Sequence, residues 1–227
     1  MDPRQPALSM FQLFTYWRSS TAYRVRIAMN LKGLSYEPSY VSIPQMAHRS
    51  AEYTALNPQG LVPTLVEDGK VVAQSLAILE FLEEQHPQPP LLPQGSYERA
   101  YVRALAQVVA CEVHPLNNVR VLKYLEKTLG VAEDARLAWY RHWMADGLAA
   151  YEAMLERRQL SGLYSFGDTV SIADVCLVPQ IYNARRFACS LEPYPRTTAI
   201  ASGCETLDAF AKAFPDSQAD APHPETR

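Results

Sequence analysis

Three consecutive hydroxyl residues, Ser19, Ser20 and Thr21, stand at the start of a predicted helix. The aromatic, partly alternating segment 10–16 before them is typical of a half-buried strand, and apolar residues after them follow helical spacing up to Gly33, which suits a C-terminal cap. The first turn of a helix has unpaired backbone N–H groups and the positive end of the helix dipole, so it stabilises a nearby anion. A thiolate is one such anion, and a hydroxyl here can donate a hydrogen bond to it. The alternative is that Ser20 only caps the helix.

A second helix start downstream has similar chemistry. Gln74 and Ser75 precede an amphipathic segment, and a backbone N–H together with a hydroxyl at such a point can hold a carboxylate. Simple capping of the helix by Ser75 explains the same residues, and both can be true. Just upstream, two short apolar runs flank Asp68-Gly69, the preferred sequence for a two-residue hairpin turn. Gln74 and Ser75 are therefore expected at the end of a β-hairpin.

Arginines in both halves of the chain are candidates for binding an acidic substrate. Several guanidinium groups converging on a cleft would select a dicarboxylate, because each can clamp a carboxylate through two hydrogen bonds. A lone arginine usually lies on a solvated surface instead. The three candidates are Arg18, Arg120 and Arg186. Arg24 and Arg26, inside the first predicted helix, are interpreted as structural braces.

The composition excludes several classes of protein. The chain has 227 residues and 48% hydrophobic content, so it can bury a core, and its net charge of -3 gives no indication of binding to nucleic acid or anionic membranes. No apolar run approaches the ~20 residues of a membrane span, and residues 1–9 lack the apolar core of a secretory signal. We therefore expect a cytoplasmic protein with a disordered leader over 1–9. Four cysteines, all after residue 100 and without a Cys-x-x-Cys pair, are expected to be buried free thiols, and no metal site is implied.

Two domains of different class are predicted. Residues 10–86 give the order strand, helix, strand, then a hairpin and a helix, which is that of a thioredoxin-like α/β domain. Four prolines within 87–93 cannot continue a helix and form a stiff linker. The remainder, 94–214, is expected to be all-helical, with helices near 96–113, 116–129, 133–157, 171–188 and 206–214. The tail 215–227 is polar and proline-rich and is expected to be disordered.

Two features of the helical half have local explanations. Ser171 and Asp174 have the spacing of a capping box, which accounts for Asp174 without catalysis. Pro115 removes a backbone donor and should kink or end the helix that contains His114. Most helix histidines are packing or surface residues, so these residues alone leave the role of His114 open.

The run from Arg18 to Ala28, Arg-Ser-Ser-Thr-Ala-Tyr-Arg-Val-Arg-Ile-Ala, resembles the active-site motif of zeta-class glutathione transferases, the family that includes maleylacetoacetate and maleylpyruvate isomerases. That motif usually has cysteine after its two serines, where this chain has Thr21. The resemblance covers 10–214 in domain order and implies glutathione as the cofactor. By family position Thr21 is expected to donate a hydrogen bond to the glutathione sulfur, with Ser20 as the alternative donor and Ser19 bracing the turn.

The same resemblance implies the other glutathione contacts of the N-terminal domain. The loop Asn-Pro-Gln-Gly-Leu-Val-Pro before the hairpin is similar to the transferase loop whose second proline is cis. A cis bond before Pro63 would turn the backbone of Val62 outward to pair with a peptide ligand, whereas an ordinary trans proline entering a strand is the alternative. Gln74 and Ser75 would hold the γ-glutamyl end of glutathione. His48 would reach the glycyl carboxylate, unless it is a solvated loop histidine.

In the helical half, the resemblance to the maleylpyruvate-isomerase branch assigns two residues to the glutathione site. His114 would line that site, and Asn118 would make a secondary polar contact. The resemblance also gives the arginines a dicarboxylate substrate to bind, and the residues concerned are Arg18, Arg120 and Arg186.

The implied fold is α/β plus all-α, the glutathione transferase fold, and the implied assembly is a homodimer. The implied activity is glutathione-dependent cis–trans isomerisation of a maleyl keto acid, with maleylpyruvate slightly favoured over maleylacetoacetate. In that reaction a thiolate adds to the carbon–carbon double bond, the bond rotates, and elimination releases the trans product. Two alternatives stay open: a general glutathione transferase or dehalogenase, and a non-catalytic binding module with the same fold.

Overall fold

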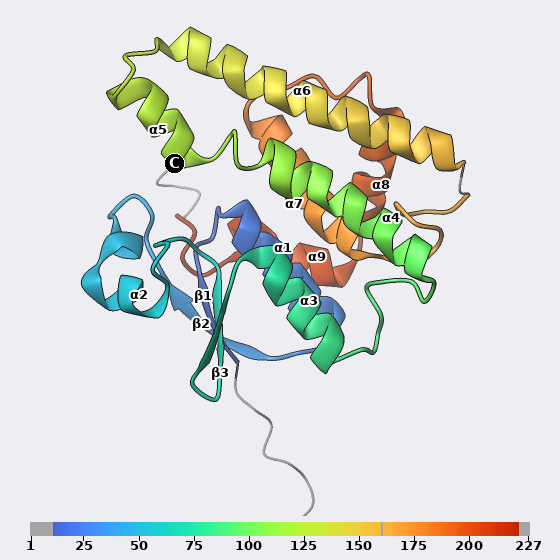
Figure 1. The fold of residues 1–227 in the computed structure, drawn as a ribbon, viewed down its shortest axis with the longest axis horizontal. Coiled ribbons are helices and arrows are strands. Elements are labelled where there is room, and N and C mark those ends of the chain that lie inside the picture. The colour runs from blue at the N-terminus through green and yellow to red at the C-terminus, as the bar shows by residue number, and fades with distance from the viewer. Residues whose placement is uncertain (1–10, 160, 223–227) are drawn as a thin grey trace, which may run out of the picture. The chain divides into compact units, whose positions relative to one another are not determined.

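The computed structural model describes residues 11–159 and 161–222 (Figure 1). These residues form two compact units. One comprises the described residues up to Pro89 together with those from Ala209 onward, and the other is Pro90–Asp208. The division falls inside the proline-rich segment 87–93. The predicted leader, 1–9, lies outside the described residues, as do residues 223–227 of the predicted tail.

The first unit contains a four-stranded sheet in the order β2-β1-β3-β4. Its elements are β1 (Phe11–Thr15), α1 (Ser20–Leu31), β2 (Tyr36–Tyr40), a 3₁₀ turn (Ala47–Arg49), α2 (Ala51–Leu56), β3 (Thr64–Glu67), β4 (Lys70–Ala73) and α3 (Ser75–Gln85). The edge strand β2 is parallel to β1, whereas β3 is antiparallel to both of its neighbours, β1 and β4. This order of elements confirms the predicted thioredoxin-like domain.

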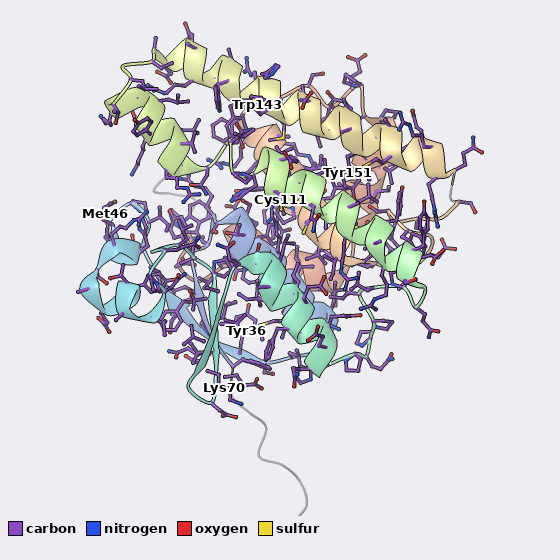
Figure 2. All side chains as sticks on the ribbon, viewed as in Figure 1. Tyr36, Met46, Lys70, Cys111, Trp143 and Tyr151 are labelled. Carbon is purple, nitrogen blue, oxygen red and sulfur yellow. The ribbon has the colours of Figure 1, made fainter. Side chains whose placement is uncertain are left out.

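The hairpin that joins β3 to β4 has the predicted turn. Asp68 and Gly69 both have positive φ, 49° and 78°, as a two-residue type I′ turn requires. Lys70 begins β4 directly after the turn (Figure 2). Four residue pairs then follow in antiparallel register, so the hairpin ends at β4 and leads straight into α3.

Helix α1 is capped by Ser19, which differs from the prediction. The Ser19 backbone is extended, and its Oγ accepts a hydrogen bond from the Ala22 N–H at 3.2 Å. Ser20 is the first helical residue, so the interpretation of Ser20 as the cap was wrong by one position. Gly33, with φ of 65°, ends the helix as predicted.

The second unit is helical throughout its described elements. These are α4 (Ser96–Gln107), a π-helical segment (Val108–Val113), α5 (Val119–Lys127), α6 (Glu133–Arg158), α7 (Ile172–Arg186) and α8 (Pro195–Glu205). Helix α7 is the core helix, because every residue from Ile172 to Ile181 is buried. Its predicted capping box is confirmed: Ser171 and Asp174 hydrogen-bond each other's backbone and side-chain groups. No helix in 11–159 or 161–222 is long and apolar enough to cross a membrane.

Pro115 ends a helix, and the helix changes character before it stops. After α4 the backbone widens into the π-helical segment, and a turn over 114–117 separates it from α5. Asn118 then caps α5, since its Oδ1 accepts from the Arg120 N–H at 3.0 Å. The π-helical segment therefore lies directly before His114.

The C-terminal half differs from the sequence-based expectations in three respects. Helix α8 was not predicted at all, because its Thr, Ala, Ser and Gly residues give little amphipathic signal, although Pro195 is well suited to the first turn. The last helix, α9 (Asp208–Ala213), belongs with the N-terminal unit apart from its first residue, so the all-helical domain does not extend to 214. Residues 215–222 are not disordered: a 3₁₀ turn over Pro215–Ser217 and a hydrogen bond from the Trp17 N–H to Asp220 hold them.

The four cysteines are free, but they are not all buried. Cys176 and Cys204 are buried in the helical unit, as expected. Cys111 is exposed on the π-helical segment (Figure 2), and Cys189 is partly exposed. Their positions do not suggest a shared chemical role.

Candidate functional site

The turn between β1 and α1 presents a chain of hydroxyl groups. The Thr21 hydroxyl donates to the Val62 carbonyl oxygen at 2.9 Å, and the Ser19 and Thr21 hydroxyl oxygens are 2.9 Å apart. Because the single Thr21 hydroxyl proton is used on Val62, the Ser19 hydroxyl must be the donor to Thr21. Ser19 in turn accepts from the first turn of α1, so one chain of hydrogen bonds runs from the helix N-terminus to the loop before β3.

Ser20 and Thr21, the two candidate sulfur ligands, differ in exposure. Ser20 is buried, whereas Thr21 is partly exposed at the helix N-terminus. The first backbone hydrogen bond within α1 runs from the Tyr23 N–H to the Ser19 carbonyl oxygen. Thr21 therefore lies in the first turn, ahead of this bond. Thr21 is therefore the more accessible of the two hydroxyls, while the Ser19 hydroxyl is bound to the Ala22 N–H and to Thr21.

The loop before β3 carries the predicted cis peptide bond. The Val62-Pro63 bond is cis, and both residues are buried. Two residues that the sequence analysis did not assign hold this loop: the Tyr53 hydroxyl donates to the Leu61 carbonyl at 2.7 Å, and the Asn57 amide donates to the same oxygen at 2.7 Å. Polar groups from α2 and from the loop itself thus fix the backbone around Val62.

The start of α3 is built differently from a plain serine cap. Gln74 occupies the cap position with φ of 73°, and its side chain donates to Gln59. Ser75 is the first helical residue and is buried, so the interpretation of Ser75 as a simple cap was wrong. Its Oγ accepts from the Arg24 Nη1 at 3.2 Å, which leaves the Ser75 hydroxyl proton to be donated elsewhere.

Arg24 adds a positive charge beneath this second helix start. Only 1% of its surface is exposed, and it reaches Ser75 from α1. A buried guanidinium next to a helix N-terminus strengthens the local attraction for an anion. The expected role of Arg24 was that of a brace only, because nothing in the spacing of α1 and α3 indicated that Arg24 and Ser75 would meet.

His48 is buried in the 3₁₀ turn, so the alternative of a solvated loop histidine is wrong. It lies against the loop that leads to Val62, because a Cβ atom at Gly60 would come 2.7 Å from the His48 carbonyl oxygen. Gly60 has φ of 58°, and this close approach explains why glycine stands there. His48, Val62 and the start of α3 therefore lie in one unit. The segment 57–64 contains Val62, packs on His48 through Gly60, and bonds to Gln74 through Gln59.

Arg26 is the brace of the hydroxyl turn. It is fully buried, and burial lowers the pKa of its guanidinium to about 10. Its hydrogen bonds go to Thr15 Oγ1 at 3.0 Å, Trp17 O at 3.0 Å, Tyr16 O at 3.4 Å and Ala213 O at 3.1 Å. Three of these acceptors belong to the end of β1 and the turn, so one side chain fixes the backbone that leads to Ser19.

Some candidate residues of the helical unit already make hydrogen bonds to neighbouring residues in the chain. Asn118 caps α5, and its amide nitrogen is 3.4 Å from the His114 Nε2. Arg120 is exposed on the first turn of α5. Asn117, which the sequence analysis passed over, is buried and donates to the Tyr140 carbonyl of α6 at 2.9 Å.

Arg18 and Arg186 are both exposed and both lie over aromatic rings. The Arg18 guanidinium carbon is 5.1 Å from the centre of the Trp17 ring, and that of Arg186 is 5.3 Å from the Phe187 ring. Phe187 stacks on Tyr140 with ring centres 3.8 Å apart. Stacking restricts these long side chains. One Arg186 N–H also donates to the Asn183 Oδ1 at 3.3 Å. A planar guanidinium held in this way can present two donors to a carboxylate.

The helical unit contains a cavity of about 470 Å³ that is separate from the predicted site residues. Residues of α4, α6 and α8 line it together with 162–165, and none of the predicted site residues is among them. Within the described residues, no group of three or more His, Cys, Asp or Glu side chains could hold a metal ion.

The donor set of the first unit fits a peptide-like dianion with a thiol. One helix start offers hydroxyls for a thiolate, and the other offers a hydroxyl backed by Arg24 for a carboxylate. The loop with the cis bond lies between them in the chain and is hydrogen-bonded to the first. A tripeptide such as glutathione has the matching groups.

The chain is similar in sequence to known proteins. Residues 18–85 match the family model "Glutathione S-transferase, N-terminal domain". A maleylpyruvate isomerase of a Ralstonia species is 49% identical over 209 residues, 92% of this chain and 99% of the relative.

Two solved structures are also similar over nearly the whole chain. The holo structure of a maleylpyruvate isomerase, described as a bacterial zeta-class glutathione S-transferase, superimposes with a TM-score of 0.91 at 48% identity, covering 93% of this chain and 100% of that one. The maleylacetoacetate isomerase of Anaeromyxobacter dehalogenans with glutathione bound in its active site has a TM-score of 0.84 at 44% identity, covering 94% of this chain and 98% of that one.

Proposed function

The chain belongs to the zeta-class glutathione transferase family, and on this premise we propose that it is a glutathione-dependent cis–trans isomerase of a maleyl keto acid. The observation that carries the proposal is the hydroxyl chain from Ser19 through Thr21 to Val62 at the N-terminus of α1. Glutathione, when bound, supplies the thiolate that adds to the double bond and is later eliminated. The protein binds it, stabilises its charge and orients the substrate.

Thr21 is proposed as the hydroxyl that stabilises the thiolate. Rotation of its O–H bond away from the Val62 carbonyl would direct the proton toward a bound sulfur, and donation from Ser19 makes Thr21 a stronger donor. Lowering the pKa of a thiol from about 8.5 to about 6.5 takes about 2.7 kcal/mol. One charge-assisted hydrogen bond together with the helix N-terminus supplies an amount of this order.

The remaining glutathione contacts are proposed on the same unit. Ser75 would donate to the γ-glutamyl carboxylate with Arg24 behind it, and the backbone of Val62 would pair with the peptide. Gln74, the cap residue of α3, would contribute its backbone N–H, while His48 would serve the glycyl end. His114 and Asn118 stay proposals for the helical unit.

The substrate is proposed to be a dicarboxylate bound by arginines. We expect Arg18→Met and Arg186→Met each to raise KM for the maleyl substrate about tenfold, because an exposed guanidinium contributes less than a buried one. Steady-state kinetics with saturating glutathione measure this effect, and Arg157→Met, an exposed position on α6, is the matched control. Unchanged KM in both variants would remove the arginine clamp, leaving Arg120 as the untested member of the group.

Between the two maleyl substrates, maleylpyruvate is the slightly favoured proposal. Thr21 in place of the usual cysteine and His114 before Pro115 support it, and so does the 49% identical maleylpyruvate isomerase. We expect purified protein with glutathione to have the higher kcat/KM for maleylpyruvate. A higher value for maleylacetoacetate would reverse the assignment. Conjugation of a general electrophile without either isomerisation would indicate a plain transferase instead.

A homodimer in the cytoplasm completes the proposal, on the strength of the family resemblance. Light scattering coupled to size-exclusion chromatography measures the assembly, and a monomer at assay concentration would contradict it. Fractionation of cells that express the protein tests the compartment.

A further inference from the structure

We propose that Asp220, near the C-terminal end, is a positioning residue for the hydroxyl turn between β1 and α1. The Trp17 N–H donates to the Asp220 Oδ2 at 2.9 Å, across 203 positions of sequence. Trp17 stands two residues before Ser19, the cap of α1. Asp220 therefore contacts the turn that presents Ser19 and Thr21 without touching either hydroxyl. The catalytic part of this inference rests on the proposed function.

Trp17 is held from both sides of its backbone. Its N–H is bound by Asp220, and its carbonyl oxygen accepts from the Arg26 Nη2 at 3.0 Å. The neighbouring Ser19 N–H donates to the Tyr16 carbonyl at 3.0 Å, which closes the turn. Because the backbone N–H and the backbone carbonyl of Trp17 are both hydrogen-bonded, the backbone between Trp17 and Ser19 has little conformational freedom.

The segment that carries Asp220 is itself firmly docked on the N-terminal unit. Phe210 and Ala213 of α9 are buried, and the Phe214 ring packs edge to face on Tyr23 of α1. The Asn30 amide donates to the Ala209 carbonyl at 2.9 Å. Asp220 therefore follows an anchored helix, and its position relative to the turn is set by these contacts.

Charge contributes to the same contact. Arg26 interacts electrostatically with the Asp220 carboxylate, and among the described residues so does Tyr40 of β2. Partial burial raises the pKa of the Asp220 carboxyl, while the Trp17 N–H and Arg26 act in the opposite direction. A neutral amide at 220 can still accept the Trp17 N–H, so hydrogen bonding and charge can be separated by substitution.

Loss of the contact should reach the reaction through geometry. Without an acceptor at 220, the Trp17 N–H loses its partner and the turn gains freedom. The Ser19 hydroxyl must stay within hydrogen-bond distance of both the Ala22 N–H and Thr21. Small misplacements of groups that meet a reacting atom have large effects on rate.

The test compares Asp220→Ala with Asp220→Asn in the full chain, with Glu84→Ala, an exposed carboxylate on α3, as the control. Amide hydrogen exchange over residues 16–22 is measured without any ligand, and kcat and KM are measured with glutathione and maleylpyruvate. Asp220→Ala should lower kcat about tenfold with little change in KM and should speed exchange over 16–22. The kcat of Asp220→Asn should stay within about threefold of that of the parent protein. Glu84→Ala should have the kcat and the exchange rates of the parent protein.

Two results would overturn the inference. Unchanged exchange over 16–22 in Asp220→Ala would show that the contact does not hold the turn. Faster exchange with unchanged kcat would show that the turn is held but that the reaction does not depend on it. A parent protein that isomerises no maleyl substrate would refute the proposed function instead, and the exchange comparison would still decide whether Asp220 positions the turn.

Discussion

Replacing Arg26 by methionine is expected to lower the free energy of unfolding by about 3 to 5 kcal/mol, because several buried acceptors each lose a hydrogen bond from a charged donor. The side chain is fully buried, and its substitution would leave acceptors in Thr15, Trp17 and Ala213 without their donor. Methionine fills similar volume, so the loss reflects hydrogen bonds more than an empty space.

Urea unfolding monitored by tryptophan fluorescence measures this change. Arg157→Met, at an exposed position of α6, is the control and should change the free energy of unfolding by no more than about 0.5 kcal/mol. A change below about 1 kcal/mol in Arg26→Met would mean that water or a shifted backbone replaces the guanidinium easily. The role of Arg26 as the brace of the turn would then be rejected.

The second large effect is expected at Thr21. Thr21→Ala should lower kcat/KM for isomerisation by about 10- to 100-fold, the size of a lost hydrogen bond to a thiolate. Glutathione affinity should change little, because the peptide and carboxylate contacts remain. Thr21→Ser keeps the hydroxyl and should stay within about threefold of the parent.

The pH dependence of kcat/KM distinguishes a chemical role of Thr21 from a structural one. If Thr21 stabilises the thiolate, its loss raises the pKa of the bound thiol, and the rise of activity with pH moves to higher pH. Thr21→Ala also deprives the Val62 carbonyl of a donor, so unfolding should be measured alongside. Full activity in Thr21→Ala combined with an inactive Ser20→Ala would transfer the role to Ser20.

Local patterns predicted most of the N-terminal fold. The alternation of β1, the Asp68-Gly69 turn and the cap at Gly33 depend on neighbours in sequence, and each is found where expected. The cis bond at Val62-Pro63 came from the resemblance to a transferase loop, because spacing alone favoured trans. The helix that was missed, α8, has no strong apolar stripe from which to infer it.

The contacts that build the site were harder to predict because they join distant residues. Arg24 and Ser75 are 51 positions apart, and Thr21 and Val62 are 41 apart, so no local period connects them. Ser75 appeared to be a cap because capping is the commonest role of serine at a helix start. The buried arginine that takes its Oγ becomes visible only once α1 and α3 pack together.

The docked C-terminal segment also sets an order of events during synthesis. Arg26 finds its Ala213 acceptor 187 residues later in the chain, and Trp17 finds Asp220 203 residues later. At about 5 to 20 residues per second, the first of these partners is made roughly 10 to 40 s after the arginine. After β4 has been made, the sheet strands and α1 still await α9, because Phe210 and Ala213 are synthesised more than 130 residues later. The N-terminal unit thus begins to fold first on the ribosome and is completed last.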